Sequence, residues 1–98
     1  MKRIILLAFL CTTTLVMAQR INHVQEAIAN YDYEAALTLI AKEKPTIPLL
    51  LQKGKAQRGL GMNTEALSTY QEIIANDTAN TRAYIEAAEC CRSLDKYQ

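Results

Sequence analysis

The feature that most constrains the fold of this chain is a similarity of the sequence to itself at a spacing of about 34 residues. When the sequence is shifted by that amount, small residues fall on small ones and apolar residues on apolar ones. The matching pairs include Leu50 with Tyr84, Leu51 with Ile85, Gly54 with Ala88, Ala56 with Cys90 and Leu60 with Leu94. Repetition at this period indicates supersecondary units that stack and cover one another's apolar faces. With 98 residues, the chain has room for one small domain built in this way.

Within each unit the apolar residues recur every three or four positions, which is the period of a helix. The pattern predicts helices that begin near Ile21, Asp32, Ile47, Asn63 and Thr81. Asp32 and Asn63 are expected to cap their helices, because a side-chain oxygen there can accept a hydrogen bond from a free backbone N–H. Pro45 is expected to end the second helix, and Gly59 and Gly61 the third.

The unit at residues 47–80 carries Gly54, then Ala66 twelve residues later, then Tyr70 four residues after that. A polar turn follows at 77–80. In these features the unit resembles a tetratricopeptide repeat. The resemblance implies an all-α fold, in which antiparallel helix–turn–helix repeats stack as a short right-handed solenoid.

The resemblance divides the chain into about two and a half repeats behind an N-terminal leader. The expected segments are a signal peptide at 1–18, a degenerate repeat at 19–46, a tetratricopeptide repeat at 47–80 and an incomplete repeat at 81–98. In the degenerate repeat, either Ala35 or Ala36 takes the place of the packing alanine. Lys53, Gln57 and Thr78 depart from the residues that are common in the family.

The resemblance also assigns packing roles to six small or aromatic residues. They are Gly54, Gly61, Ala66, Tyr70, Tyr84 and Ala88. Gly54 and Ala66 are expected where the two helices of a pair cross, since a larger side chain would hold the helices apart. Tyr70 is expected to fill the space between that pair and the next, and Gly61 to allow the tight turn within the pair.

The inner helices of tetratricopeptide arrays line a concave groove that holds extended peptides or partner helices. By resemblance, the partner-binding residues are Leu51, Lys55 and Arg58 in one repeat and Ile85, Glu89 and Arg92 in the next. Lys55 and Glu89 occupy equivalent positions of successive repeats and could pair across adjacent helices. The alternative interpretation is that these side chains form an ordinary solvated face.

The N-terminus has the pattern of a secretory signal peptide. Lys2 and Arg3 form a basic start, and an unbroken apolar run follows at 4–10. Val16 and Ala18 then supply the aliphatic and small residues that a signal peptidase site requires. The expected cleavage is after Ala18. An uncleaved membrane anchor is the alternative, although the apolar run is short for a span of about 20 residues.

Charge and composition exclude several classes of function. Without Lys2 and Arg3 the chain keeps nine basic and ten acidic side chains, a net charge near −1. Such a balance argues against a nucleic-acid partner. No Gly-rich phosphate loop or metal-ligand cluster is evident, so no cofactor is expected. His23 has no catalytic partner at a known spacing, and the adjacent Cys90 and Cys91 are expected among buried packing residues, with a redox role as the alternative.

These features favour recognition over catalysis. The leading interpretation is an exported tetratricopeptide-type adaptor that binds another protein or peptide in the periplasm or at the cell envelope. A second interpretation is the extracytoplasmic sensor segment of a longer signalling protein, and a third is an enzyme with an unrecognised site. Because the third repeat lacks its second helix, the chain is expected to be marginally stable or to self-associate through that uncapped end.

Overall fold

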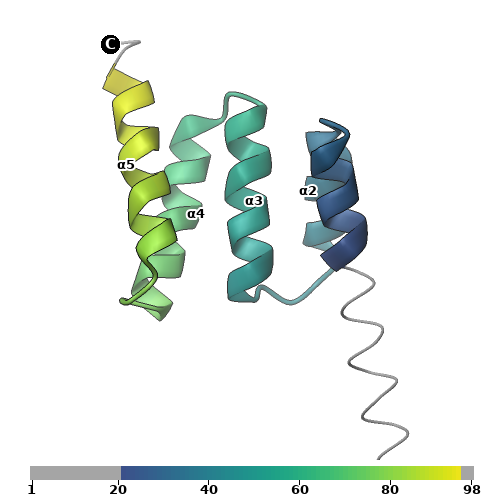
Figure 1. The fold of residues 1–98 in the computed structure, drawn as a ribbon, viewed down its shortest axis with the longest axis horizontal. Helices are drawn as coiled ribbons and strands as arrows, with labels where there is room; N and C mark the ends of the chain where they lie inside the picture. Colours follow the sequence, from purple (N-terminus) through teal and green to yellow (C-terminus); the bar gives the residue numbers. More distant parts are fainter. Residues whose placement is uncertain (1–20, 96–98) are drawn as a thin grey trace, which may run out of the picture.

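The computed structural model describes residues 21–95, and within that range the chain is helical and contains no strand (Figure 1). Residues 21–29 form the first helix. It is followed by α2 (Tyr33–Ala41), α3 (Ile47–Gly59), α4 (Asn63–Asn76) and α5 (Thr81–Asp95). The predicted all-α fold is therefore confirmed, with a helix at each expected position.

The signal peptide predicted at 1–18 lies outside the described residues. Among the helices within 21–95, α5 is the longest and has 15 residues, whereas a membrane span needs about 20. None of the helices in this range is long and apolar enough to cross a bilayer.

The helices are arranged in two layers (Figure 1). Residues 21–29, α3 and α5 form the nearer layer in this view, and α2 and α4 lie behind them. α2 packs against α3, α3 against α4, and α4 against α5. α3 begins at Ile47 and α5 at Thr81, two positions that the repeat shift superimposes, and both helices occupy the same layer. The repeat spacing of the sequence is therefore also a spacing of helices.

Side-chain oxygens cap the first two of the labelled helices. Asp32 Oδ1 accepts a hydrogen bond from the backbone N–H of Ala35 at 3.2 Å, which confirms the predicted cap of α2. Thr46 caps α3, since its hydroxyl accepts from the N–H of Leu49 at 3.4 Å. Pro48 lies in the first turn of α3, where its missing N–H leaves no hydrogen bond unmade.

The predicted cap of α4 is wrong. Asn63 is the first residue of the helix, and Met62 stands at the capping position with no side-chain hydrogen bond. The turn before it depends on Gly61, whose φ of +77° favours glycine, as predicted. At α5, Asn80 Oδ1 accepts a hydrogen bond from the N–H of Ala83 at 3.1 Å and supplies a cap.

The interior consists of two apolar clusters that share α3. The first joins residues 21–29, α2 and α3 through Val24, Ile28, Ala36, Ile40, Leu49 and Ala56. The second joins α3, α4 and α5 through Leu50, Ala66, Tyr70, Ile73, Ala83 and Cys90. The adjacent Leu49 and Leu50 belong to different clusters, so α3 is covered on two flanks. Ala36 is fully buried and Ala35 half-buried, which identifies Ala36 as the packing alanine of the first pair.

Gly54 lies at the contact of α3 with α4, as predicted, but the group that requires a glycine there is Tyr70. A Cβ atom on Gly54 would lie 2.5 Å from Cζ of the Tyr70 ring. Ala66 is fully buried in the same cluster, and Ala83 and Cys90 of α5 complete it. Tyr70 therefore packs within its own helix pair and also against the next helix.

A buried polar pair lies between α3 and α4. Gln57 and Thr69 are both buried, and the Thr69 hydroxyl donates a hydrogen bond to Gln57 Oε1 at 2.7 Å. The same hydroxyl lies 3.1 Å from the backbone oxygen of Glu65, so its single proton has two acceptors. Gln57 thus joins α3 to α4 by a polar contact where an apolar side chain would pack.

The exposed face of α5 carries Tyr84, Ala88 and Cys91. Tyr84 is 48% exposed and Ala88 is exposed, which agrees with the expectation that this side of the last helix is uncovered. Cys91 was also expected among buried packing residues, and that expectation is wrong, because Cys91 is exposed. The equivalent residues of α3 pack against α4, whereas no helix within residues 21–95 covers this side of α5. Of the two cysteines within residues 21–95, only Cys90 is buried, because it packs against α4.

Candidate functional site

A cavity of about 350 Å³ opens between α3 and α5. Its α3 wall includes Leu51, Lys55 and Arg58, and its α5 wall includes Arg82 and Glu86. The cavity also reaches Ile21 and Gln25 of the first helix, and Tyr70 of α4 contributes to its lining. We call this cavity the α3–α5 groove.

Helix periodicity explains why these side chains meet. Leu51, Lys55 and Arg58 follow one another at four and three residues, so they form one stripe along α3. Arg82 and Glu86 are four residues apart and form a stripe along α5. Because α3 and α5 lie in one layer, their facing stripes become the two walls of the groove.

Tyr70 reaches the groove from the layer behind. Its side chain is 1% exposed, and burial raises the pKa of its phenol to about 12, with the negative charge of Glu86 as a second cause. The phenol is therefore neutral at physiological pH. Tyr70 thus adds an aromatic residue to a site that is otherwise lined by charged, amide and apolar side chains.

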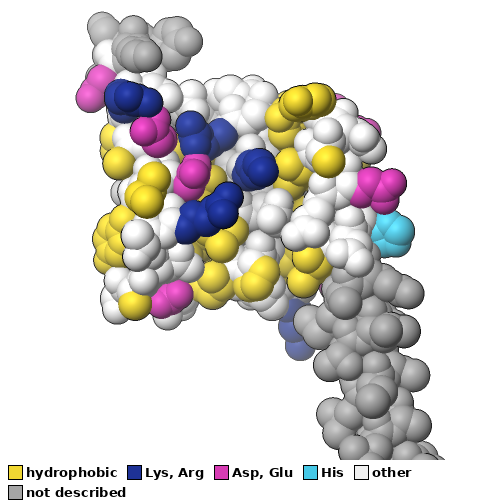
Figure 2. Space-filling model, in the orientation of Figure 1, with side chains coloured by type: hydrophobic (Ala, Val, Ile, Leu, Met, Phe, Trp, Pro, Cys, Tyr) yellow, Lys and Arg dark blue, Asp and Glu magenta, His cyan; other side chains and the backbone are white. Residues whose placement is uncertain are grey.

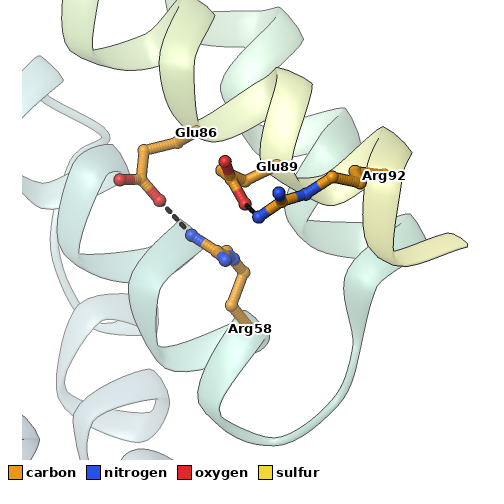
Figure 3. Close-up of polar contacts among 4 residues, drawn as sticks. All are labelled: Arg58, Glu86, Glu89 and Arg92. Carbon is orange, nitrogen blue, oxygen red and sulfur yellow. Dashed lines mark hydrogen bonds and ion pairs between the residues drawn. The ribbon is translucent and has the colours of Figure 1, made fainter.

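An ion pair joins the two walls of the groove (Figure 3). Arg58 Nη1 of α3 contacts Glu86 Oε2 of α5, and the two side chains are only 31% and 26% exposed. A second ion pair, between Arg92 and Glu89, lies entirely on α5 and is more exposed, at 68% and 38%. Of these two pairs only the first bridges two helices, so it connects elements that are distant in the sequence.

The charge of the groove is positive. Lys55, Arg58 and Arg82 face a single anion, Glu86. Lys55 and Arg82 are exposed and form no ion pair with any residue in 21–95. Figure 2 shows Lys and Arg side chains gathered over the middle of this face, between hydrophobic patches. The arrangement can attract an anionic group while Leu51 offers an apolar contact.

Three of the six residues predicted to bind a partner line the groove. Leu51, Lys55 and Arg58 do so, while Ile85, Glu89 and Arg92 of α5 are not among the residues that line the cavity. Ile85 is 57% exposed and does not line the cavity. The predicted pairing of Lys55 with Glu89 is not found, because Glu89 pairs with Arg92 of its own helix.

Sequence reasoning missed Arg82 and Glu86 for a geometric reason. The repeat shift assigned the same flank of α3 and of α5 to the groove. Two parallel neighbours, however, face each other with opposite flanks. Under that shift Arg82 and Glu86 match Pro48 and Gln52, which line the cavity beside Ile21 and Gln25 of the first helix. Arg82 and Glu86 are found by asking which side chains face each other on neighbouring helices, and not by asking which residues occupy equivalent positions of the repeat.

A second hollow of about 410 Å³ continues the groove toward the turn between the first helix and α2. It shares Gln25, Gln52 and Lys55 with the groove and adds Tyr31 and Tyr33. Tyr31 has a φ of +60°, is 79% exposed, and sets its ring edge-on to Tyr33 with centroids 6.3 Å apart. An aromatic residue held in the left-handed region costs free energy, so its surroundings must hold it there.

The chemically reactive side chains of the described residues do not converge on the groove. His23 is exposed on the first helix, and Cys91 is exposed on α5. Burial raises the pKa of the Cys90 thiol, so that group is held in its neutral, unreactive form. Within 21–95 no three His, Cys, Asp or Glu side chains are grouped so as to hold a metal ion.

Comparison with family models, with curated proteins and with solved structures found no match to this chain.

Proposed function

We propose that this protein is a tetratricopeptide-type adaptor that binds a segment of another protein in the α3–α5 groove. The observation that carries the proposal is the groove itself. It unites the apolar side chain of Leu51 with the cations Lys55, Arg58 and Arg82 on a concave surface. Several helices contribute to it, so the site exists only in the folded molecule.

The size of the groove favours a short segment as its ligand. Sites for small ligands typically enclose about 300 to 1,000 Å³, and this groove lies near the lower end of that range. A few side chains of an extended segment fit such a volume. The adjoining hollow at Tyr31 and Tyr33 lengthens the available surface along the same face.

The place of action in this proposal is the periplasm or the cell envelope. The basic start, the apolar run and the small residue at Ala18 support export, and they come from the sequence alone. The repeat assignment rests on the spacing of the matching residues and on the packing of Gly54 and Tyr70.

A peptide selection followed by NMR tests the proposed function. The protein is used to select binders from a random peptide library, and backbone amides are then monitored while a selected peptide is added. We expect the amide shifts to concentrate at 51–58 and 82–86. Selection of no peptide, or shifts confined to the opposite layer, would refute binding in the groove.

A matched pair of variants sharpens this test. Gln52→Trp places a large side chain into the groove and is expected to weaken peptide binding by about tenfold or more. Gln71→Trp makes the same change at an exposed position of α4 and is expected to leave binding unchanged. Equal effects of the two substitutions would also contradict the proposal.

A further inference from the structure

We propose that Glu86 is an internal competitor, which occupies the anion position beside Arg58 until an acidic segment of the partner replaces it. This inference rests on the proposed function and specifies the chemistry of the ligand. The class of ligand is a peptide segment that carries a carboxylate. The charge of the groove, the position of the Arg58–Glu86 pair and the position of Arg82 support it.

The charge of the groove selects an acidic ligand. Three cations and one anion line it, although the whole chain has a formal net charge of only +1. Lys55 and Arg82 form no ion pair within the described residues. A ligand carboxylate would gain charge-assisted hydrogen bonds from these groups, and guanidinium groups suit carboxylates in particular because they can donate two parallel bonds.

The position of Glu86 makes it the group that a ligand must replace. Its carboxylate contacts Arg58 across the groove, from the opposite wall (Figure 3). Arg58 is the least exposed of the three cations, so an anion bound there is screened least by solvent. Glu86 thus already occupies the position where an external carboxylate would bind most favourably.

Arg82 gives Glu86 an alternative partner. It lies four residues before Glu86 on α5, one helical turn away, where an ion pair within the helix can form. When a ligand carboxylate takes Arg58, Glu86 can turn to Arg82 without leaving the surface of α5. The exchange needs only rotation of side chains and no movement of helices.

The chain offers a matched control for the test. Glu89 lies on the same helix as Glu86, but it pairs with Arg92 of its own helix and does not line the groove. Glu86→Gln and Glu89→Gln therefore remove the same charge from α5. An effect of overall charge appears in both variants, whereas an effect of competition appears only in the first.

The experiment measures binding of a fluorescein-labelled hexaglutamate peptide by anisotropy at low salt. We expect Glu86→Gln to bind about threefold to fivefold more tightly than the wild type, as befits the loss of one surface ion pair. Glu89→Gln is expected to bind as the wild type does. Arg58→Gln is expected to lose most of the binding and Arg92→Gln to retain it, and a hexalysine peptide is expected not to bind.

The sign of the Glu86→Gln effect separates competition from a structural role. If the ion pair only held α3 to α5, its removal would loosen the groove and weaken binding. Binding by Glu86→Gln that equals or falls below that of Glu89→Gln would therefore overturn the inference, provided that thermal melts show both variants folded. Should Glu86→Gln fail to fold, Glu86→Asp, which keeps the charge but shortens the reach to Arg58, must bind more tightly than the wild type.

Failure of this inference is distinguishable from failure of the proposed function. Peptides that bind in the groove but carry no acidic residue would overturn the inference alone. Absence of any peptide from the groove would remove both.

Discussion

At the scale of single residues, two tyrosine rings occupy the space that a side chain would need at two glycines. The ring of Tyr70 lies against Gly54, and the ring of Tyr33 lies against Gly59. An added Cβ would come within 2.5 Å of the ring in both cases. The Tyr70 ring has less room to move than the Tyr33 ring. Tyr70 is fully enclosed by the second cluster, while Tyr33 is only half-buried.

This difference predicts unequal effects of the same substitution. Gly54→Ala should destabilise the protein, because a cost of overpacking of about 1 to 3 kcal/mol outweighs the gain in helix propensity of about 1 kcal/mol. Gly59→Ala should cost less, since Tyr33 can rotate toward solvent. Urea denaturation of the two variants checks the order of stability.

A double variant tests the cause of the Gly54 effect. In a Tyr70→Leu background the ring atoms nearest to Gly54 are gone, so Gly54→Ala should cost less there than in the wild type. Equal costs in the two backgrounds would show that Tyr70 is not what Gly54 accommodates.

Tyr70 also makes stability depend on pH. Its pKa is raised from 10.0 to about 12 in the folded protein, chiefly by burial. The folded state therefore keeps the phenolic proton that the unfolded state loses above pH 10. The corresponding stability is fully present below pH 10 and lost as the pH rises toward 12, with a maximum loss of about 2 to 3 kcal/mol.

The matched variant for this prediction is Tyr70→Phe, which keeps the ring and removes the titrating group. Denaturation of both proteins at several pH values between 9 and 12 should show a steeper decline for the wild type. Parallel curves would mean that Tyr70 titrates alike in the folded and unfolded states.

At the scale of elements, α3 and α5 match each other in sequence at the repeat spacing, but their matching residues have different neighbours. Leu50, Gly54 and Gln57 of α3 contact α4. Their equivalents on α5, one repeat later, are Tyr84, Ala88 and Cys91, and all three are exposed. The same pattern of small and apolar residues is therefore covered on one helix and open to solvent on the other.

The two adjacent cysteines of α5 differ in burial, because one lies on the covered side of the helix and the other on the open side. Cys90 is fully buried with a raised pKa, whereas Cys91 is exposed on the open side of α5. Because the thiolate is the reactive form, we expect a thiol reagent to modify Cys91 quickly and Cys90 only on unfolding. Mass spectrometry of peptides after brief treatment at neutral pH would locate the adduct, and comparable labelling of both thiols in the native protein would contradict this orientation of α5.

At the scale of the whole molecule, no helix within residues 21–95 covers the side of α5 that carries Tyr84, Ala88 and Cys91. Each helix of a stacked array covers its neighbour, and apolar residues left uncovered form a surface that water solvates poorly. We expect the protein to show a concentration-dependent tendency to self-associate through Tyr84, Ala88 and Cys91. Sedimentation at several protein concentrations measures this tendency.

A helix added to cover this side of α5 should remove the tendency to self-associate. A copy of residues 63–76 placed after Gln98 by a short linker would cover α5 as α4 covers α3, and we expect a higher melting temperature and a monomeric protein. A copy with its buried Ala66, Tyr70 and Ile73 replaced by Glu serves as the control and should give no gain. An unaltered melting temperature with the native copy would mean that the open side of α5 costs little.

Local features of the structure were predictable from the sequence. The helices begin and end near the expected residues because apolar periodicity, Asp32, Pro48 and Gly61 act within a few residues of their own position. The predicted cap at Asn63 is wrong by one residue, since Met62 stands at the capping position. A capping residue differs from the first helical residue only in its backbone geometry, which the sequence does not show. The close packing at Gly54 was likewise predicted, because a glycine inside a helix leaves room for a neighbouring helix or a large side chain to approach.

Tertiary structure decided which flank of each helix meets which neighbour. Arg58 pairs with Glu86, which is not its equivalent one repeat later, because α3 and α5 meet through different positions of the repeat. Ala88 and Cys91 are exposed because their burial depends on a following helix and not on their own character. Periodicity predicts that a helix has an apolar side. Which helix covers that side depends on contacts between residues far apart in the chain, and these contacts form only when the helices pack.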